Sequence, residues 1–200
     1  SPLFIPGDDF ETVRVVRDSG TPSCSTVKQL SYSELSATLN TAGQPNLKEQ
    51  GMLAKLYPSL NPGVNEMFFC RVLILVEGIE DLAHLSSYIS LIGLMPKFRK
   101  CGCHIVPVGG KSEIIKPLAM AKQLDIPVFV IIDADTDAVK AEHITKHKND
   151  NKAILSLMGY EAESEWPAND ILKSDFAMWK HNLTKLVDAD MGDKWSIHVN

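Results

Sequence analysis

Short runs of apolar, mostly β-branched residues recur through the middle of the chain, at 72–76, 104–108 and 128–132. The last run is bounded by a proline and by aspartates, which is typical of a strand that is buried on both faces. Apolar residues at helical spacing occupy the stretches between the runs, over 79–95 and 112–124. This alternation predicts a parallel α/β sheet with right-handed crossovers.

The pattern is less regular on both sides of this centre. Two β-branched segments, 12–16 and 26–30, flank turn-forming residues and predict a hairpin. Ser31-Tyr-Ser-Glu34 has the sequence of a capping box, which predicts that a helix begins there. The other predicted elements are a helix over 47–57, a polar helix over 139–158, a loop over 161–169, a strand over 175–179 and a helix over 182–189.

The predicted fold class is α/β: a Rossmann-like parallel sheet flanked by helices, with an accessory part that is mostly helical. In a chain of 200 residues, one large domain with an accessory segment is the expected organisation. The predicted segments are an extended or hairpin segment over 1–30, a helical linker over 31–69, the sheet core over 70–137, a helical insertion over 138–173, and the last strand and helix of the core over 174–200.

Three aspartates, Asp133, Asp135 and Asp137, follow the strand predicted over 128–132. In open α/β sheets, ligands bind at the carboxyl ends of the strands. Each pair of these carboxylates, at about 5 Å and an effective dielectric constant near 20, repels by roughly 3 kcal/mol. A hard divalent cation is the usual means of offsetting such repulsion.

A second acidic group, Glu77-Gly78-x-x-Asp81, follows the strand over 72–76. An acidic residue such as Asp81 in a first helical turn is also explained by the helix macrodipole alone. If the three central strands lie in the order 2-1-3, however, the two acidic strand ends are neighbours. We then expect four carboxylates, Glu77, Asp81, Asp133 and Asp135, to converge on one site.

Two other known motifs also place aspartates at this spacing. A calcium-binding loop is excluded, because it needs Gly where Ala138 stands and Glu where Ile144 stands. A phosphatase motif, with Asp133 as the nucleophile that forms an aspartyl-phosphate, remains a minor alternative. Its fifth position is Asp137 instead of Thr.

Two further motifs carry weaker signals. Gly109-Gly-Lys-Ser112 is not a P-loop, because the first Gly of that motif would fall at Ile105 inside a strand. It is either a tight strand–helix turn or a site for one phosphate, in which Lys111 would neutralise the anion. His143 and His147 share one face of a locally basic helix, which favours a solvated or phosphate-contacting surface over a zinc site.

Composition excludes some classes of protein. The net charge of -5 argues against a globally basic nucleic-acid coat. Four cysteines without paired spacing indicate reduced thiols. No apolar run reaches the roughly 20 residues of a spanning helix, so we expect a soluble, cytoplasmic protein without a membrane partner. The chain opens on Ser1-Pro2, which suggests a fragment of a longer protein.

A strand ending in Glu77-Gly78, then Asp81, then a strand ending in Asp133-x-Asp135, resembles the Toprim domain. The runs 64–78, 106–112 and 124–135 are similar to the form of this domain found in the OLD (overcoming lysogenization defect) endonucleases. The segment 1–5 resembles residues near the end of an ABC-type ATPase. The resemblance covers most of 1–190 and is specific from Glu66 to Asp135.

This resemblance implies the C-terminal nuclease half of an ATP-dependent endonuclease, whose preceding ATPase domain binds the ATP. Residues 1–30 would then be a remnant of that ATPase region. The implied partners are DNA, the ATPase domain and, in a homodimer formed through other regions, a second copy of the protein. The implied cofactors are two Mg²⁺ or Mn²⁺ ions. The implied metal ligands are Glu77, Asp81, Asp133 and Asp135. A downstream acid, from among Glu161, Glu163 and Glu165, completes the metal site. A basic residue is also implied, and its unmatched candidates are Lys173, Lys180, Lys185 and Lys194.

The resulting hypothesis is phosphodiester hydrolysis by two ions about 4 Å apart, with Glu77, Asp133 and Lys111 as catalytic residues. Two rivals stay open. One is a Toprim-shaped interaction module without chemistry. The other is a phosphotransferase that uses Asp133 as its nucleophile.

Overall fold

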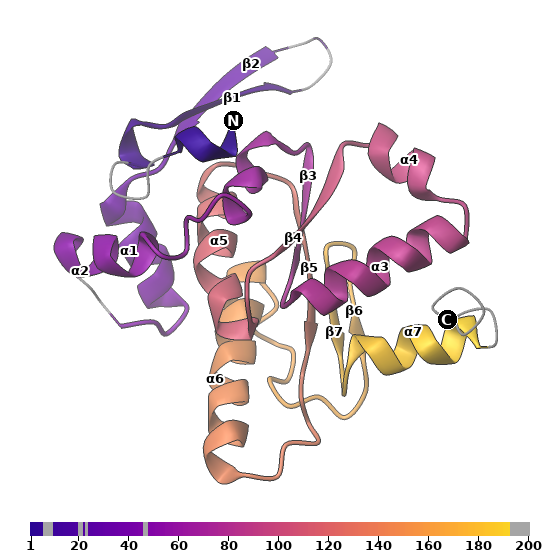
Figure 1. Ribbon diagram of the computed structural model, residues 1–200. Helices are drawn as coiled ribbons and strands as arrows, with labels where there is room; N and C mark the ends of the chain where they lie inside the picture. The colour runs from indigo at the N-terminus through magenta and orange to yellow at the C-terminus, as the bar shows by residue number, and fades with distance from the viewer. Residues whose placement is uncertain (6–9, 20–21, 23, 46–47, 193–200) are drawn as a thin grey trace.

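The computed structural model describes residues 1–5, 10–19, 22, 24–45 and 48–192. Its central sheet contains β3 (Val72–Val76), β4 (Cys103–Pro107), β5 (Val128–Asp133), β6 (Ile171–Leu172) and β7 (Phe176–Trp179). The strands lie in the order β4-β3-β5-β7-β6, and every neighbouring pair is parallel except β6 and β7 (Figure 1). The predicted α/β fold class is therefore confirmed.

Helices cover both faces of the sheet (Figure 1). One layer contains α1 (Tyr32–Thr41), α5 (Lys111–Gln123) and α6 (Ala141–Met158), with the short helix α2 (Glu49–Leu56) beside α1. The other layer contains α3 (Ile79–Leu91) and α7 (Leu183–Met191), with α4 (Met95–Lys100) beside the edge strand β4. In the described part of the chain, no helix combines the length and the apolar character needed to cross a membrane.

The alternating side chains of β5 explain why both faces are covered. Val130 is fully buried in the main core, together with Leu118 of α5. Ile131 faces the opposite side and packs in a smaller cluster with Val187 of α7. This second contact holds α7 against the sheet, with its first turn close to the end of β5.

The predicted N-terminal hairpin is present as β1 (Arg14–Ser19) and β2 (Cys24–Gln29), which form a separate antiparallel sheet. Two short 3₁₀ helices, η1 (Pro2–Phe4) and η2 (Phe10–Thr12), precede the hairpin, and a third, η3 (Val64–Phe69), precedes β3. Phe10 and Val15 are buried in the main core, and Arg17 Nη2 donates to the Cys70 carbonyl at 2.8 Å. The hairpin is thus attached to the same core as the central sheet. Residues 20 and 21 of its predicted turn lie outside the described residues.

Three local predictions differ from the structure, and two short elements were not predicted. The helix predicted over 79–95 ends at Leu91, because Gly93 has a left-handed φ of 75°, and α4 occupies most of the loop predicted over 96–102. The capping box is not formed: Ser31 makes no capping bond, and its hydroxyl contacts that of Ser33 at 2.9 Å. The 3₁₀ helix η3 and the strand β6 were not predicted, since both are too short to show a period.

Candidate metal centre

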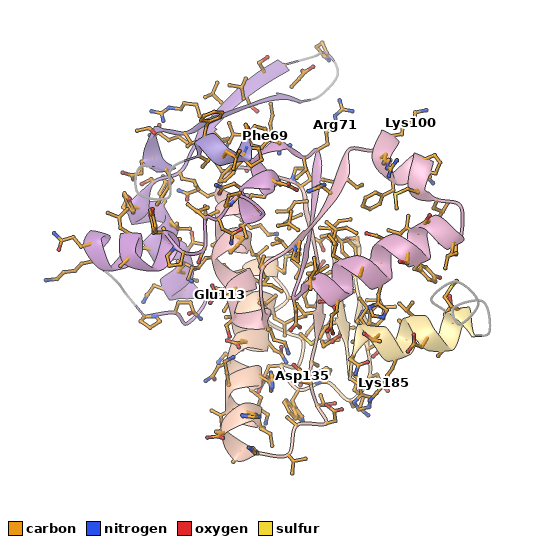
Figure 2. The ribbon with its side chains drawn as sticks, viewed as in Figure 1. Phe69, Arg71, Lys100, Glu113, Asp135 and Lys185 are labelled. Atoms are coloured by element: carbon orange, nitrogen blue, oxygen red, sulfur yellow. The ribbon has the colours of Figure 1, made fainter. Side chains whose placement is uncertain are left out.

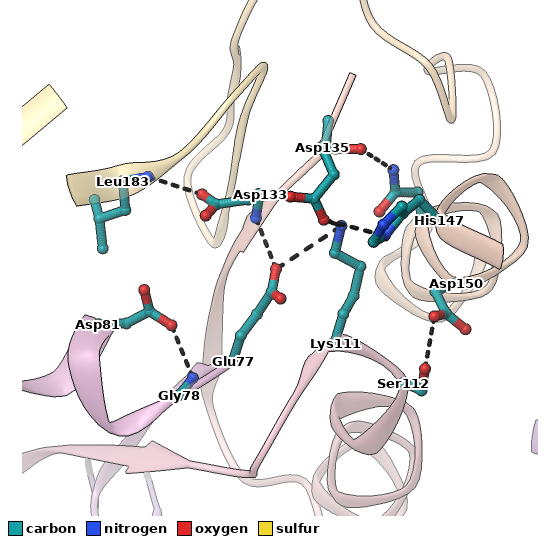
Figure 3. A network of polar contacts seen from close by, with 12 residues as sticks. Glu77, Gly78, Asp81, Lys111, Ser112, Asp133, Asp135, His147, Asp150 and Leu183 are labelled. Atoms are coloured by element: carbon teal, nitrogen blue, oxygen red, sulfur yellow. Dashed lines mark hydrogen bonds and ion pairs between the residues drawn. The ribbon is translucent and has the colours of Figure 1, made fainter. Parts of the chain in front are cut away.

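Two acidic strand ends lie side by side at the carboxyl edge of the sheet (Figure 3). Because β3 lies between β4 and β5, the three central strands have the expected order 2-1-3. Glu77 follows β3 directly, and its Oε1 accepts the backbone N–H of Asp133, the last residue of β5, at 2.9 Å. This bond joins two residues that are 56 positions apart in the sequence.

Asp81 both caps the start of α3 and lies near the other carboxylates, the two roles that its sequence position allowed. It lies in the first turn of α3, where its Oδ2 accepts the Gly78 N–H at 2.8 Å and so caps the helix. Its charge also raises the pKa of both Glu77 and Asp133, so it lies within electrostatic reach of the strand ends. Burial is the main reason that the pKa of Asp81 itself is raised.

Asp133 is the most strongly perturbed member of the cluster. Burial first, and then the charges of Glu77, Asp81 and Asp135, raise its pKa to about 8. Its Oδ1 accepts the Leu183 N–H at 2.9 Å, in the first turn of α7, where unpaired backbone donors favour a negative charge. Burial likewise raises the pKa of Glu77 to about 7, although Lys111 opposes that shift.

Asp135, which Figure 2 labels, lies in the loop beyond the end of β5. Its backbone has φ of 55°, a left-handed conformation that costs a non-glycine residue on the order of 1 kcal/mol. Its Oδ2 lies 2.5 Å from Lys111 Nζ and 3.1 Å from His147 Nδ1. Burial lowers the pKa of His147, against the opposite effect of Asp135.

The glycine pair before Lys111 forms a tight turn. The N–H groups of Gly109 and Gly110 both donate to the Glu77 carbonyl, at 2.9 and 2.7 Å. Gly110 has φ of 135°, which an L side chain rarely adopts. These two donors are thus used within the protein, and the turn orients Lys111 toward the cluster.

Among the described residues, no side-chain hydrogen bond or ion pair joins the downstream acids to this cluster. Glu163 forms an ion pair with Lys173 at 2.5 Å, and the carbonyl of Glu165 accepts from Asn151 at 3.0 Å. Glu161, Glu163 and Glu165 line a separate cavity between the end of α1 and α6. The structure thus shows no contact that brings Glu163 or Glu165 to Asp133 among the described residues. Asp137 is exposed.

The remaining lysines that are candidates for the basic residue of the site lie in different parts of the chain. The Lys180 carbonyl accepts the N–H of Thr136 at 3.2 Å, next to the aspartates, and Lys185 lies in the first turn of α7 (Figure 2). Lys194 lies outside the described residues.

Sequence reasoning missed the contribution of α6. His143 pairs with its exposed neighbour Glu142 at 3.7 Å, whereas His147 faces Asp135. Asn151, which is fully buried, donates to the Ala134 carbonyl at 3.1 Å. The i, i+4 spacing of His147 and Asn151 on one helix face was the signal that could have indicated this contact.

The donors of the cluster fit a hard divalent cation, because all four carboxylates present oxygen atoms. The raised pKa values of Glu77 and Asp133 also mean that their negative charges are poorly offset without a cation. Among the described residues, however, no three His, Cys, Asp or Glu side chains are already gathered around one point that could hold a metal ion. Some carboxylates therefore have to turn toward a bound ion.

Comparison with known families agrees with this geometry. Residues 68–135 match the family described as overcoming lysogenization defect protein-like, TOPRIM domain. The matched segment contains Glu77, Asp81, Lys111, Asp133 and Asp135, and it ends before α6. No curated protein matches the chain. Residues 68–135, with the acidic strand ends that meet at the edge of the sheet, therefore belong to the OLD-like Toprim family.

Proposed function

We propose that this chain carries a metal-dependent nuclease site that hydrolyses phosphodiester bonds in DNA. The observation that supports this most strongly is the bond between Glu77 and the Asp133 backbone, which joins the acidic ends of β3 and β5. The match to an OLD-like Toprim domain indicates nuclease-type metal binding in general. DNA as the substrate, the use of two Mg²⁺ or Mn²⁺ ions and coupling to an ATPase domain are the finer parts of this proposal.

In this mechanism Glu77, Asp81, Asp133 and Asp135 hold the ions. When bound, the ions supply an activated water and stabilise charge on the leaving oxygen. The protein orients the ligands: the Asp133 N–H holds the Glu77 carboxylate, and the Leu183 N–H holds the Asp133 carboxylate. The exposed lysines of α6, such as Lys146 and Lys152, offer charges for DNA phosphates.

The test compares Asp133→Asn with Asp137→Asn in nicking of supercoiled plasmid with Mn²⁺. Both variants remove one carboxylate from the same five-residue segment, but only Asp133 belongs to the carboxylate cluster, whereas Asp137 is exposed. We expect Asp133→Asn to lower the nicking rate by on the order of a hundredfold or more, since a metal ligand is lost. Asp137→Asn should stay within about twofold of the parent. Undiminished nicking by Asp133→Asn would rule out this site.

A non-catalytic interaction module is the second candidate. The observation in its favour is that, among the described residues, the carboxylates are not gathered around one point. This candidate predicts no nicking in any divalent ion, which the same assay decides. A phosphotransferase would instead leave a trapped phosphate on Asp133.

A further inference from the structure

Lys111 is a buried cation inside the carboxylate cluster. Only 4% of its side chain is exposed, and its Nζ lies 2.5 Å from Asp135 Oδ2 and 3.9 Å from Glu77 Oε1 (Figure 3). Its backbone is anchored as well, because α5 begins at Lys111 directly after Gly109 and Gly110, whose N–H groups bond to the Glu77 carbonyl. The ammonium group is therefore held between the ends of β3 and β5.

The four carboxylates of the cluster form two pairs, which differ in the groups that they contact. Glu77 and Asp135 share the ammonium group of Lys111, and His147 contacts the same oxygen of Asp135 from α6. Asp81 and Asp133 bond instead to backbone N–H groups, at the starts of α3 and α7. Lys111 thus offsets two of the negative charges that a divalent ion would otherwise offset.

We propose that Lys111 is an internal counter-ion that competes with a divalent cation for Glu77 and Asp135. The ammonium group has to leave Asp135 before that carboxylate can turn toward an ion. This inference rests on the proposed metal-binding function and adds a residue that regulates it. Lys111 lowers the affinity of the cluster for metal, and it neutralises the partly buried acids while no metal is bound. It also accounts for carboxylates that are close in space but not gathered around one point.

The first experiment measures Mn²⁺ binding to Lys111→Gln by isothermal titration calorimetry. Removing a positive charge beside the ion should tighten binding on the order of tenfold or more. The matched control is Lys116→Gln, in the same helix. Lys116 is also partly buried and ion-paired, with Glu113 at 3.0 Å, so this variant loses the same charge outside the cluster. We expect no change for the control. Equal or weaker Mn²⁺ binding by Lys111→Gln would overturn the proposal.

A second experiment uses the unmutated protein, because Lys111→Gln leaves two partly buried acids without their cation and could fail to fold. Lysine amines are labelled with acetic anhydride, and the extent at each lysine is read by mass spectrometry. Saturating Mn²⁺ should raise labelling of Lys111 severalfold, since its ammonium group is released, and should leave Lys116 unchanged. Labelling of Lys111 that is the same with and without Mn²⁺, at saturation, contradicts the proposal.

The two proposals fail in different ways. If the parent protein nicks DNA but Lys111→Gln binds Mn²⁺ no more tightly, the counter-ion role is wrong and the nuclease proposal stands. If no nicking is found but Lys111→Gln gains affinity, the counter-ion role stands and the non-catalytic module is favoured. Absence of Mn²⁺ binding by both proteins overturns both proposals.

Discussion

At the scale of single residues, environment separates side chains that are chemically identical. Asp133 and Asp137 are four positions apart, yet only Asp133 is buried beside other acids and bonded to the start of α7. Asp135, between them, takes a left-handed backbone conformation and pairs with Lys111. Three aspartates in one short segment therefore have three different electrostatic roles.

The raised pKa values predict how metal binding depends on pH. A cation binds the ionised carboxylates, and the pKa values of Glu77 and Asp133 are about 7 and about 8. We expect Mn²⁺ affinity to increase from pH 6 to pH 9, with release of about one proton per binding event near pH 7.5. Calorimetric titration in buffers of different ionisation enthalpy measures both quantities.

The same titration has its own control. Asp137→Asn should keep the pH profile of the parent, whereas Asp133→Asn should bind more weakly and release fewer protons. An affinity that does not change between pH 6 and pH 9 in the parent would show that these two carboxyls are not ligands.

At the scale of elements, α6 holds the loop that carries Asp135. Asn151 donates to the carbonyls of Ala134 and Glu165, at 3.1 and 3.0 Å, and so joins α6 to two loops. Ser112 Oγ donates to Asp150 at 2.6 Å and joins α5 to the same helix. These buried contacts support the backbone conformation of the aspartate loop.

Removal of this support should be measurable. Asn151→Ala removes two buried hydrogen bonds and should lower the free energy of unfolding by about 1–3 kcal/mol. Asn149→Ala is the control, since Asn149 lies in the same helix but is exposed, and its effect should stay within about 0.5 kcal/mol. Urea denaturation followed by circular dichroism gives both values. Equal effects of the two variants would show that the loop contacts contribute nothing to stability.

At the scale of the whole molecule, one main core extends from the N-terminal hairpin to β7. Helices on both faces exclude water from the sheet, and the acidic strand ends lie at its carboxyl edge. Folding therefore brings carboxylates together and partly buries them. This arrangement lowers the free energy of unfolding as pH rises. An acid with a raised pKa keeps its proton in the folded state at pH values where the unfolded chain has already released it.

This cost predicts how stability without metal depends on pH. Glu77 and Asp133 have ordinary pKa values of 4.5 and 3.8, which folding raises to about 7 and about 8. Below pH 4 both states are protonated and nothing is lost. Between about pH 4 and pH 8 the folded state binds more protons, so the free energy of unfolding should fall as pH rises and level off above pH 8.

Denaturation in EDTA across this range tests the prediction. The free energy of unfolding of Asp133→Asn should fall less with rising pH than that of the parent. At pH 8 this variant should be more stable than the parent by roughly 1–3 kcal/mol. Asp137→Asn, which removes an exposed charge, should follow the parent. A parent whose stability rises steadily from pH 5 to pH 8 would contradict the raised pKa values.

Much of the fold could be predicted because its central elements have clear periods. The strands predicted over 72–76 and 128–132 agree with β3 and β5 to within one residue. Features without a period were missed: β6 has two residues, α4 begins after a left-handed glycine, and Ser31 has a capping sequence but a different partner. Local sequence does not decide such features, since neighbouring segments compete for the same backbone and hydroxyl groups.

The sequence by itself determined the alternation of strands and helices and the acids that close β3 and β5, because both depend on residue types at short spacing. Only the tertiary structure decided which groups meet. The order of the strands brought Glu77 to Asp133, the crossover through α5 placed Lys111 between Glu77 and Asp135, and the packing of α6 turned His147 toward the same carboxylate. Burial then raised the pKa values of the acids, since the cost of a charge depends on the water that folding removes.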